Sequence, residues 1–61
     1  DIPRARLASA EQQVMSRSYP AALRNAQAAE ASLPRGTPDW IRAQDIALEA
    51  RSALERLRYR L

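Results

Sequence analysis

The sequence contains no cysteine, no histidine and no lysine, and each absence removes a class of function. Without cysteine no disulfide can stabilise the 61-residue chain, and without cysteine or histidine the usual zinc ligand sets are missing. The serines have no histidine or lysine to act as a general base, which argues against a serine nucleophile. We therefore expect no catalytic residue, no metal site and no cofactor, and we predict that the chain by itself is not an enzyme.

Long apolar runs are also missing. No stretch approaches the roughly 20 apolar residues that a membrane-spanning helix requires, and no signal peptide or lipid-attachment motif is visible. The chain starts at Asp1 rather than methionine, which is typical of a processed protein, a fragment of a larger protein or a trimmed segment. Because so short a chain buries only about 60% of its unfolded surface, we expect self-association or a parent domain to add stability.

The charge is mixed rather than concentrated. Ten arginines against seven acidic residues give a net charge of +3. At about 100° per residue, Arg51 and Arg58 lie on one side of a C-terminal helix, whereas Arg56 and Arg60 lie on another. A nucleic-acid site usually gathers its cations on one face. A small basic helical nucleic-acid binder is therefore a rival interpretation that the charge pattern disfavours.

Alanine, leucine, glutamate and arginine dominate the composition, and all four favour helices. We predict one small all-α domain over residues 1–61, with helices at about 3–16, 20–33 and 38–59. The first two helices should form an antiparallel hairpin, and the third is longer than either. The stretch "LPRGTPDW" predicts the clearest boundary, since Gly36 suits a left-handed turn and Thr37 suits a helix N-cap before Pro38.

Small and apolar residues recur at helical spacing and should face a common core, with Trp40 packing at the start of the third helix and Tyr19 at the hairpin turn. The predicted inward residues are Leu7, Ala10, Val14 and Met15 in the first helix; Ala22, Leu23, Ala26, Ala29 and Leu33 in the second; and Ala43, Ile46, Ala47, Ala50, Ala53, Leu54, Leu57 and Leu61 in the third. So many alanines indicate that the helices pack closely. Ile41 and Leu48 lie seven residues apart on another face.

One helix carries a repeat-like pattern. The pattern comprises Tyr19, Ala22, Ala26, Ala29 and Pro34. This spacing resembles the second half of a tetratricopeptide repeat, a helix–turn–helix unit of about 34 residues. Trp40 then falls in the tryptophan position of a following repeat, which gives about one and a half repeats. The first helix departs from the family pattern at Arg6, Ser9 and Gln13.

The resemblance implies a protein–protein interaction module that docks a peptide or a helix in the groove between the first and third helices. The candidate partner-binding residues on those helices are Gln13, Arg17, Gln44, Asp45 and Leu48.

A second resemblance concerns the stretch "LPRGTPDWIRAQDI", residues 33–46. It is similar to a segment in the helical-repeat tails of bacterial zinc metalloproteases of the HExxH type. This likeness implies a C-terminal regulatory or substrate-docking tail, with the parent catalytic domain as partner and the periplasm or cell envelope as compartment. Otherwise we expect a cytoplasmic protein. The HExxH motif itself is absent, so no metal ligand or catalytic residue is transferred to this chain.

Two carboxylates on one helix face need a separate interpretation. Asp45 and Glu49 are four residues apart, a spacing compatible with metal binding or with acid–base chemistry. Helical spacing also places Arg42 within reach of Asp45. We expect solvated ion pairs with arginine rather than a metal site.

Overall fold

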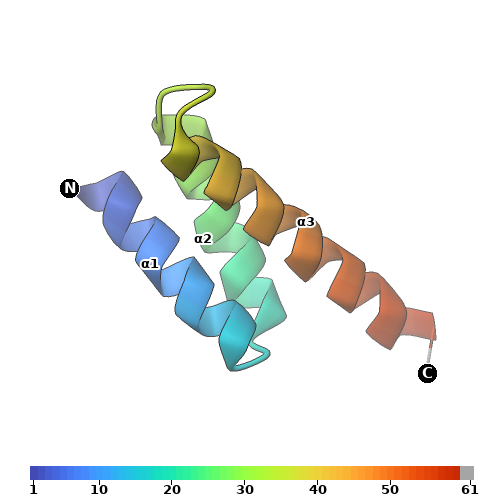
Figure 1. Ribbon diagram of the computed structural model, residues 1–61. Coiled ribbons are helices and arrows are strands. Elements are labelled where there is room, and N and C mark those ends of the chain that lie inside the picture. The colour runs from blue at the N-terminus through green and yellow to red at the C-terminus, as the bar shows by residue number, and fades with distance from the viewer. Residues whose placement is uncertain (60–61) are drawn as a thin grey trace.

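The computed structural model describes residues 1–59, which form three α-helices (Figure 1): α1 (Ile2–Met15), α2 (Tyr19–Ser32) and α3 (Pro38–Tyr59). The predicted helices match these bounds to within one residue at each end. Helices α1 and α2 form an antiparallel hairpin, and α3 packs mainly on α2 and less extensively on α1. The predicted all-α hairpin with a longer third helix is therefore confirmed. Arg60 and Leu61 lie outside the described residues.

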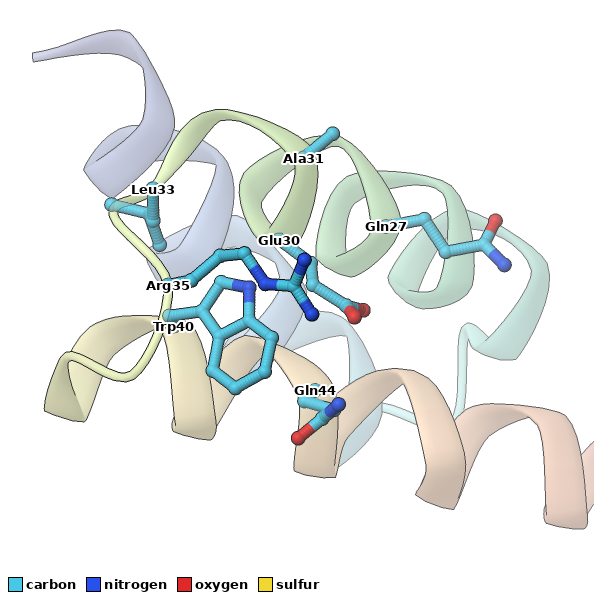
Figure 2. Close-up of a pocket in the computed structure, with 7 residues that line it drawn as sticks. All are labelled: Gln27, Glu30, Ala31, Leu33, Arg35, Trp40 and Gln44. Carbon is cyan, nitrogen blue, oxygen red and sulfur yellow. The ribbon is translucent and has the colours of Figure 1, made fainter.

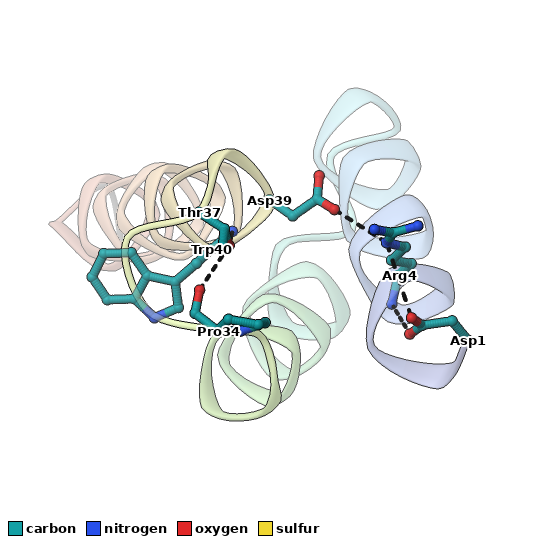
Figure 3. Close-up of polar contacts among 6 residues, drawn as sticks. All are labelled: Asp1, Arg4, Pro34, Thr37, Asp39 and Trp40. Atoms are coloured by element: carbon teal, nitrogen blue, oxygen red, sulfur yellow. Dashed lines mark hydrogen bonds and ion pairs between the residues drawn. The ribbon is translucent and has the colours of Figure 1, made fainter.

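Local side-chain signals fix the start of two helices. Asp1 caps α1, because its Oδ1 accepts a hydrogen bond from the Arg4 backbone N–H at 3.2 Å. The predicted N-cap of α3 is also confirmed, since Thr37 Oγ1 accepts from the Trp40 backbone N–H at 3.3 Å (Figure 3). The same hydroxyl donates to the Pro34 carbonyl at 2.7 Å, which ties the end of the α2–α3 loop to its beginning.

Alanine makes up most of the core. The buried apolar residues are Leu7, Ala10, Ala22, Ala26, Ala29, Leu33, Ala43, Ile46, Ala47, Ala50 and Ala53. Ile46 is the largest side chain that is completely buried, and Val14, Leu23 and Trp40 pack half-buried against the edge of this cluster. Because each methyl group removes little apolar surface from water, hydrophobic stabilisation per residue is small. Stability therefore depends on many close backbone approaches.

The prediction that Met15 faces the core is wrong. Met15 is 84% exposed, although it was expected to face inward. It directly follows Val14, which packs against the core, and one residue turns a helix by about 100°. Met15 is also the last residue of α1, so no further turn of the helix covers it.

Two ion pairs connect α1 to α3. Arg4 Nε lies 3.3 Å from Asp39 Oδ2 (Figure 3), and Arg42 Nε lies 3.1 Å from Glu11 Oε2. The expected pair of Arg42 with Asp45 does not form, because packing of α3 against α1 brings Glu11 to the guanidinium instead. All four side chains remain substantially exposed, so each pair contributes at most about 1 kcal/mol and serves chiefly to set the register of the two helices.

The close packing can be tested by enlarging one buried methyl group. We expect Ala26→Leu to lower the free energy of unfolding by about 1–3 kcal/mol, because no space remains for three extra carbons where the helices meet. Urea denaturation followed by circular dichroism measures the change. The matched control is Ala31→Leu on the exposed side of the same helix, which should stay within about 0.5 kcal/mol. Equal effects of the two substitutions would contradict close packing.

The α2–α3 loop offers a second test. Gly36 has φ of 84°, and a Cβ atom built on it would meet nothing within 4 Å. Gly36→Ala should therefore lower the free energy of unfolding by about 1 kcal/mol through backbone strain alone. Gly36→Asn should cost less, since asparagine tolerates the left-handed region better than alanine. Thermal unfolding of the two variants side by side gives the comparison; no difference between them would contradict the strain explanation.

Candidate partner-binding surface

The α1–α2 turn closes with a Schellman motif that has arginine at its left-handed position. The Ser18 backbone N–H donates to the Gln13 carbonyl at 2.7 Å, and the Arg17 N–H donates to the Val14 carbonyl at 3.1 Å. Arg17 has φ of 63°, and it is the only non-glycine residue with positive φ among residues 1–59. Glycine is the usual residue at this position. The backbone of the turn is therefore strained at Arg17.

The core-facing side of α3 continues past the end of the hairpin. Helix α3 has 22 residues, against 14 in each hairpin helix, and its distal part extends beyond the α1–α2 turn (Figure 1). Along this side Ala53 is buried, Leu54 is half-buried and Leu57 is 48% exposed. Leu57 was predicted to face inward. It lies on the predicted face, but the hairpin ends before it can cover the side chain.

These two features enclose an open cleft of about 720 Å³. Its lining residues are Arg17 from the turn, Tyr19 from the start of α2, and Ala53, Arg56, Leu57 and Tyr59 from α3. The described lining of the cleft thus combines apolar carbons, two aromatic rings and two guanidinium groups, and it includes no carboxylate from residues 1–59. Its volume falls within the roughly 300–1,000 Å³ typical of ligand-binding clefts. We define these six residues as the distal cleft.

A second concavity surrounds Trp40, between the end of α2 and the start of α3. Figure 2 shows the Arg35 side chain lying along the indole, and the guanidinium carbon is 5.7 Å from the ring centroid. The concavity is also lined by Gln27, Glu30 and Gln44. Because a cation–π contact already covers one face of the ring, Trp40 offers less apolar surface to a partner than its size suggests. Its predicted packing against the core is confirmed.

The structure separates the five predicted partner-binding residues into three places. Gln44, Asp45 and Leu48 line one shallow concavity, but it lies between α3 and α2 rather than between α3 and α1. In either orientation of the Gln13 amide, its oxygen accepts a hydrogen bond from Asn25 Nδ2 of α2, so this side chain connects the hairpin helices. Arg17 lines the distal cleft. That these residues bind a partner stays a prediction.

Sequence reasoning missed most of the distal cleft. Arg56, Leu57 and Tyr59 were not predicted as binding residues, and Tyr19 was assigned only to packing at the turn. A signal for them was present in the lengths of the elements. A long third helix beside a shorter hairpin must carry part of its apolar side beyond its partners, and the arginines nearest to that part then border it.

Several other kinds of site find no support in residues 1–59. No group of three or more acidic side chains there could hold a metal ion, and Asp45 and Glu49 are exposed without an ion-pair partner in that part of the chain. No described helix is both long and apolar enough to cross a membrane.

Comparison of the chain with protein-family models, with curated proteins and with solved structures found no match.

The strained α1–α2 turn predicts a substitution that stabilises the fold, whereas most substitutions destabilise it. Arg17→Gly should raise the free energy of unfolding by about 0.5–1 kcal/mol, because glycine adopts the left-handed conformation without a steric penalty. The matched control is Arg24→Gly on the exposed face of α2, which should lower it by about 1 kcal/mol. Chemical denaturation of both variants measures the two shifts. Destabilisation by both would mean that Arg17 makes a stabilising contact that outweighs its strain.

Proposed function

We propose that this chain is a non-catalytic protein–protein interaction module that docks a peptide or a helix in the distal cleft. The observation that carries the proposal is the half-exposed Leu57, which continues the core-facing side of α3 where no other helix within residues 1–59 covers it. Apolar surface next to a concavity is the usual basis of helix-in-groove recognition. The cleft is lined by the α1–α2 turn, the first residue of α2 and the distal part of α3, so the proposed docking place lies at the end of the hairpin rather than between α1 and α3.

The tetratricopeptide-like spacing supports the same class of function, because such repeats present helical surfaces to other polypeptides. The resemblance of residues 33–46 to metalloprotease tails supports an alternative within this class. In that case the docked partner would be a catalytic domain or its substrate, and this chain would position it.

The charge distribution favours a polypeptide over nucleic acid. On α3 the acidic residues Asp45, Glu49 and Glu55 are exposed between the arginines. A phosphate backbone that followed the helix would have to pass these carboxylates, whereas a short peptide could occupy the cleft without meeting them. The two tyrosines of the cleft also favour contact with peptide side chains, since tyrosine is enriched in protein interfaces.

The proposal is tested by selecting peptides on the whole 61-residue chain from an unbiased display library and measuring their affinity by calorimetry. We expect Leu57→Ser to weaken the selected peptides about tenfold, because it removes the apolar contact at the cleft. The matched control is Leu48→Ser, since Leu48 is 62% exposed on the same helix but lies outside the cleft.

Each outcome is decisive. If Leu48→Ser weakens binding and Leu57→Ser does not, the partner binds the concavity of Gln44, Asp45 and Leu48 instead of the distal cleft. If the library yields no binder that competes for either surface, the interaction function itself fails. Circular dichroism of both variants establishes that each remains helical.

A further inference from the structure

We infer that the segment docked in the distal cleft is an acidic peptide that carries an apolar or aromatic anchor. This inference rests on the proposed docking function and adds the chemistry of the partner. Two guanidinium groups line the cleft, Arg17 from the α1–α2 turn and Arg56 from α3, and none of its lining residues within 1–59 carries a carboxylate. A ligand in the cleft therefore meets positive charge from two different elements.

The positive charge at the cleft is not neutralised within residues 1–59. Arg4 and Arg42 pair with carboxylates across the α1–α3 contact, and Arg35 lies over the indole of Trp40. Among the residues that the structure describes, neither Arg17 nor Arg56 has such an ion pair. On α3 the described neighbours three and four residues from Arg56 are Ser52, Ala53 and Tyr59, none of them acidic, so helical spacing offers this arginine no counter-charge.

The position of Arg17 adds an independent argument. Its left-handed backbone would be relaxed by glycine, yet the chain carries there a long cationic side chain that lines the cleft. Strain of this kind at a surface is typical of positions that serve binding rather than stability. A guanidinium can also form two parallel hydrogen bonds with one carboxylate, which gives an acidic partner geometric specificity.

Charge alone would not hold a partner, because exposed ion pairs are weak. The apolar lining of the cleft supplies the second element, because Ala53, Leu57 and the ring of Tyr19 line it together with the two arginines. An apolar or aromatic anchor on the partner would bury this surface and exclude water around the ion pairs. The expected ligand is therefore amphipathic, with one anchor residue flanked by glutamate or aspartate.

The same charges argue against two other occupants. A second copy of the chain also carries a net charge of +3. In a symmetric dimer formed through this cleft, Arg17 and Arg56 of one copy would face the same two arginines of the other, and the like charges would repel. A nucleic acid would gain from the arginines and tyrosines, but beyond the short cleft it would meet exposed Glu49 and Glu55.

The test uses the whole chain labelled with ¹⁵N and three synthetic peptides of equal length with the same leucine and tryptophan anchors. Their flanking residues are all glutamate, all glutamine or all lysine, and single-stranded oligothymidine is a fourth probe. We expect the glutamate peptide to bind at least about tenfold more tightly than the glutamine peptide, and the lysine peptide not to bind. The backbone signals that shift should be those of the turn and of distal α3, and added salt should weaken binding.

Charge-neutralising variants locate the effect. Arg17→Gln combined with Arg56→Gln should weaken the glutamate peptide about tenfold or more. The matched control combines Arg6→Gln with Arg24→Gln, two exposed arginines outside the cleft, so the net charge changes equally. The control variant should bind the glutamate peptide within about twofold of the unmodified chain. Both double variants lose the same net charge, so the general effect of charge on binding is the same in each.

Several results would overturn the inference. If the glutamine peptide binds the cleft as tightly as the glutamate peptide, docking holds and the acidic partner is wrong. If none of the peptides binds and the display library is also unproductive, the docking function fails as well. Tighter binding of oligothymidine at the same residues would assign the cleft to nucleic acid. Concentration-dependent shifts of the cleft signals without any probe would assign it to a second copy.

Discussion

The close approach of three helices through alanine is the constraint on which the other features depend. A side chain that ends at Cβ lets helix axes come near each other, but it also leaves little volume for large core residues, and Ile46 is the largest one fully enclosed. The hairpin is consequently narrow and short. Helix α3 packs against this hairpin along only part of its length, so its distal part extends past the hairpin. The apolar side of that distal part is therefore exposed at the surface.

Features controlled by neighbouring residues were predictable from the sequence. Proline in the first turn and a capping hydroxyl at Thr37 act within a few residues, so the helix bounds could be predicted from the local amino-acid sequence. The alanine stripe of α2 was predictable for the same reason, because helical periodicity alone decides which residues share a face. The resulting fold class and the position of most core residues are confirmed.

Features that depend on how elements meet were not predictable in the same way. Spacing along α3 favoured Asp45 as the partner of Arg42, but tertiary packing brought Glu11 closer. Arginine has no preference for left-handed backbone, so nothing in "SRSY" indicated that Arg17 would close a Schellman motif. The distal cleft depends on two such features together, the geometry of the α1–α2 turn and the projecting end of α3.

The thin alanine core also determines how the fold responds to temperature and denaturant. Unfolding exposes little apolar surface per residue, so the heat-capacity change and the denaturant dependence of stability should both be small for this length. A small heat-capacity change flattens the curve of stability against temperature. Such a chain would lose its structure gradually over a broad range of conditions, and a partner that adds apolar contacts would make that transition steeper.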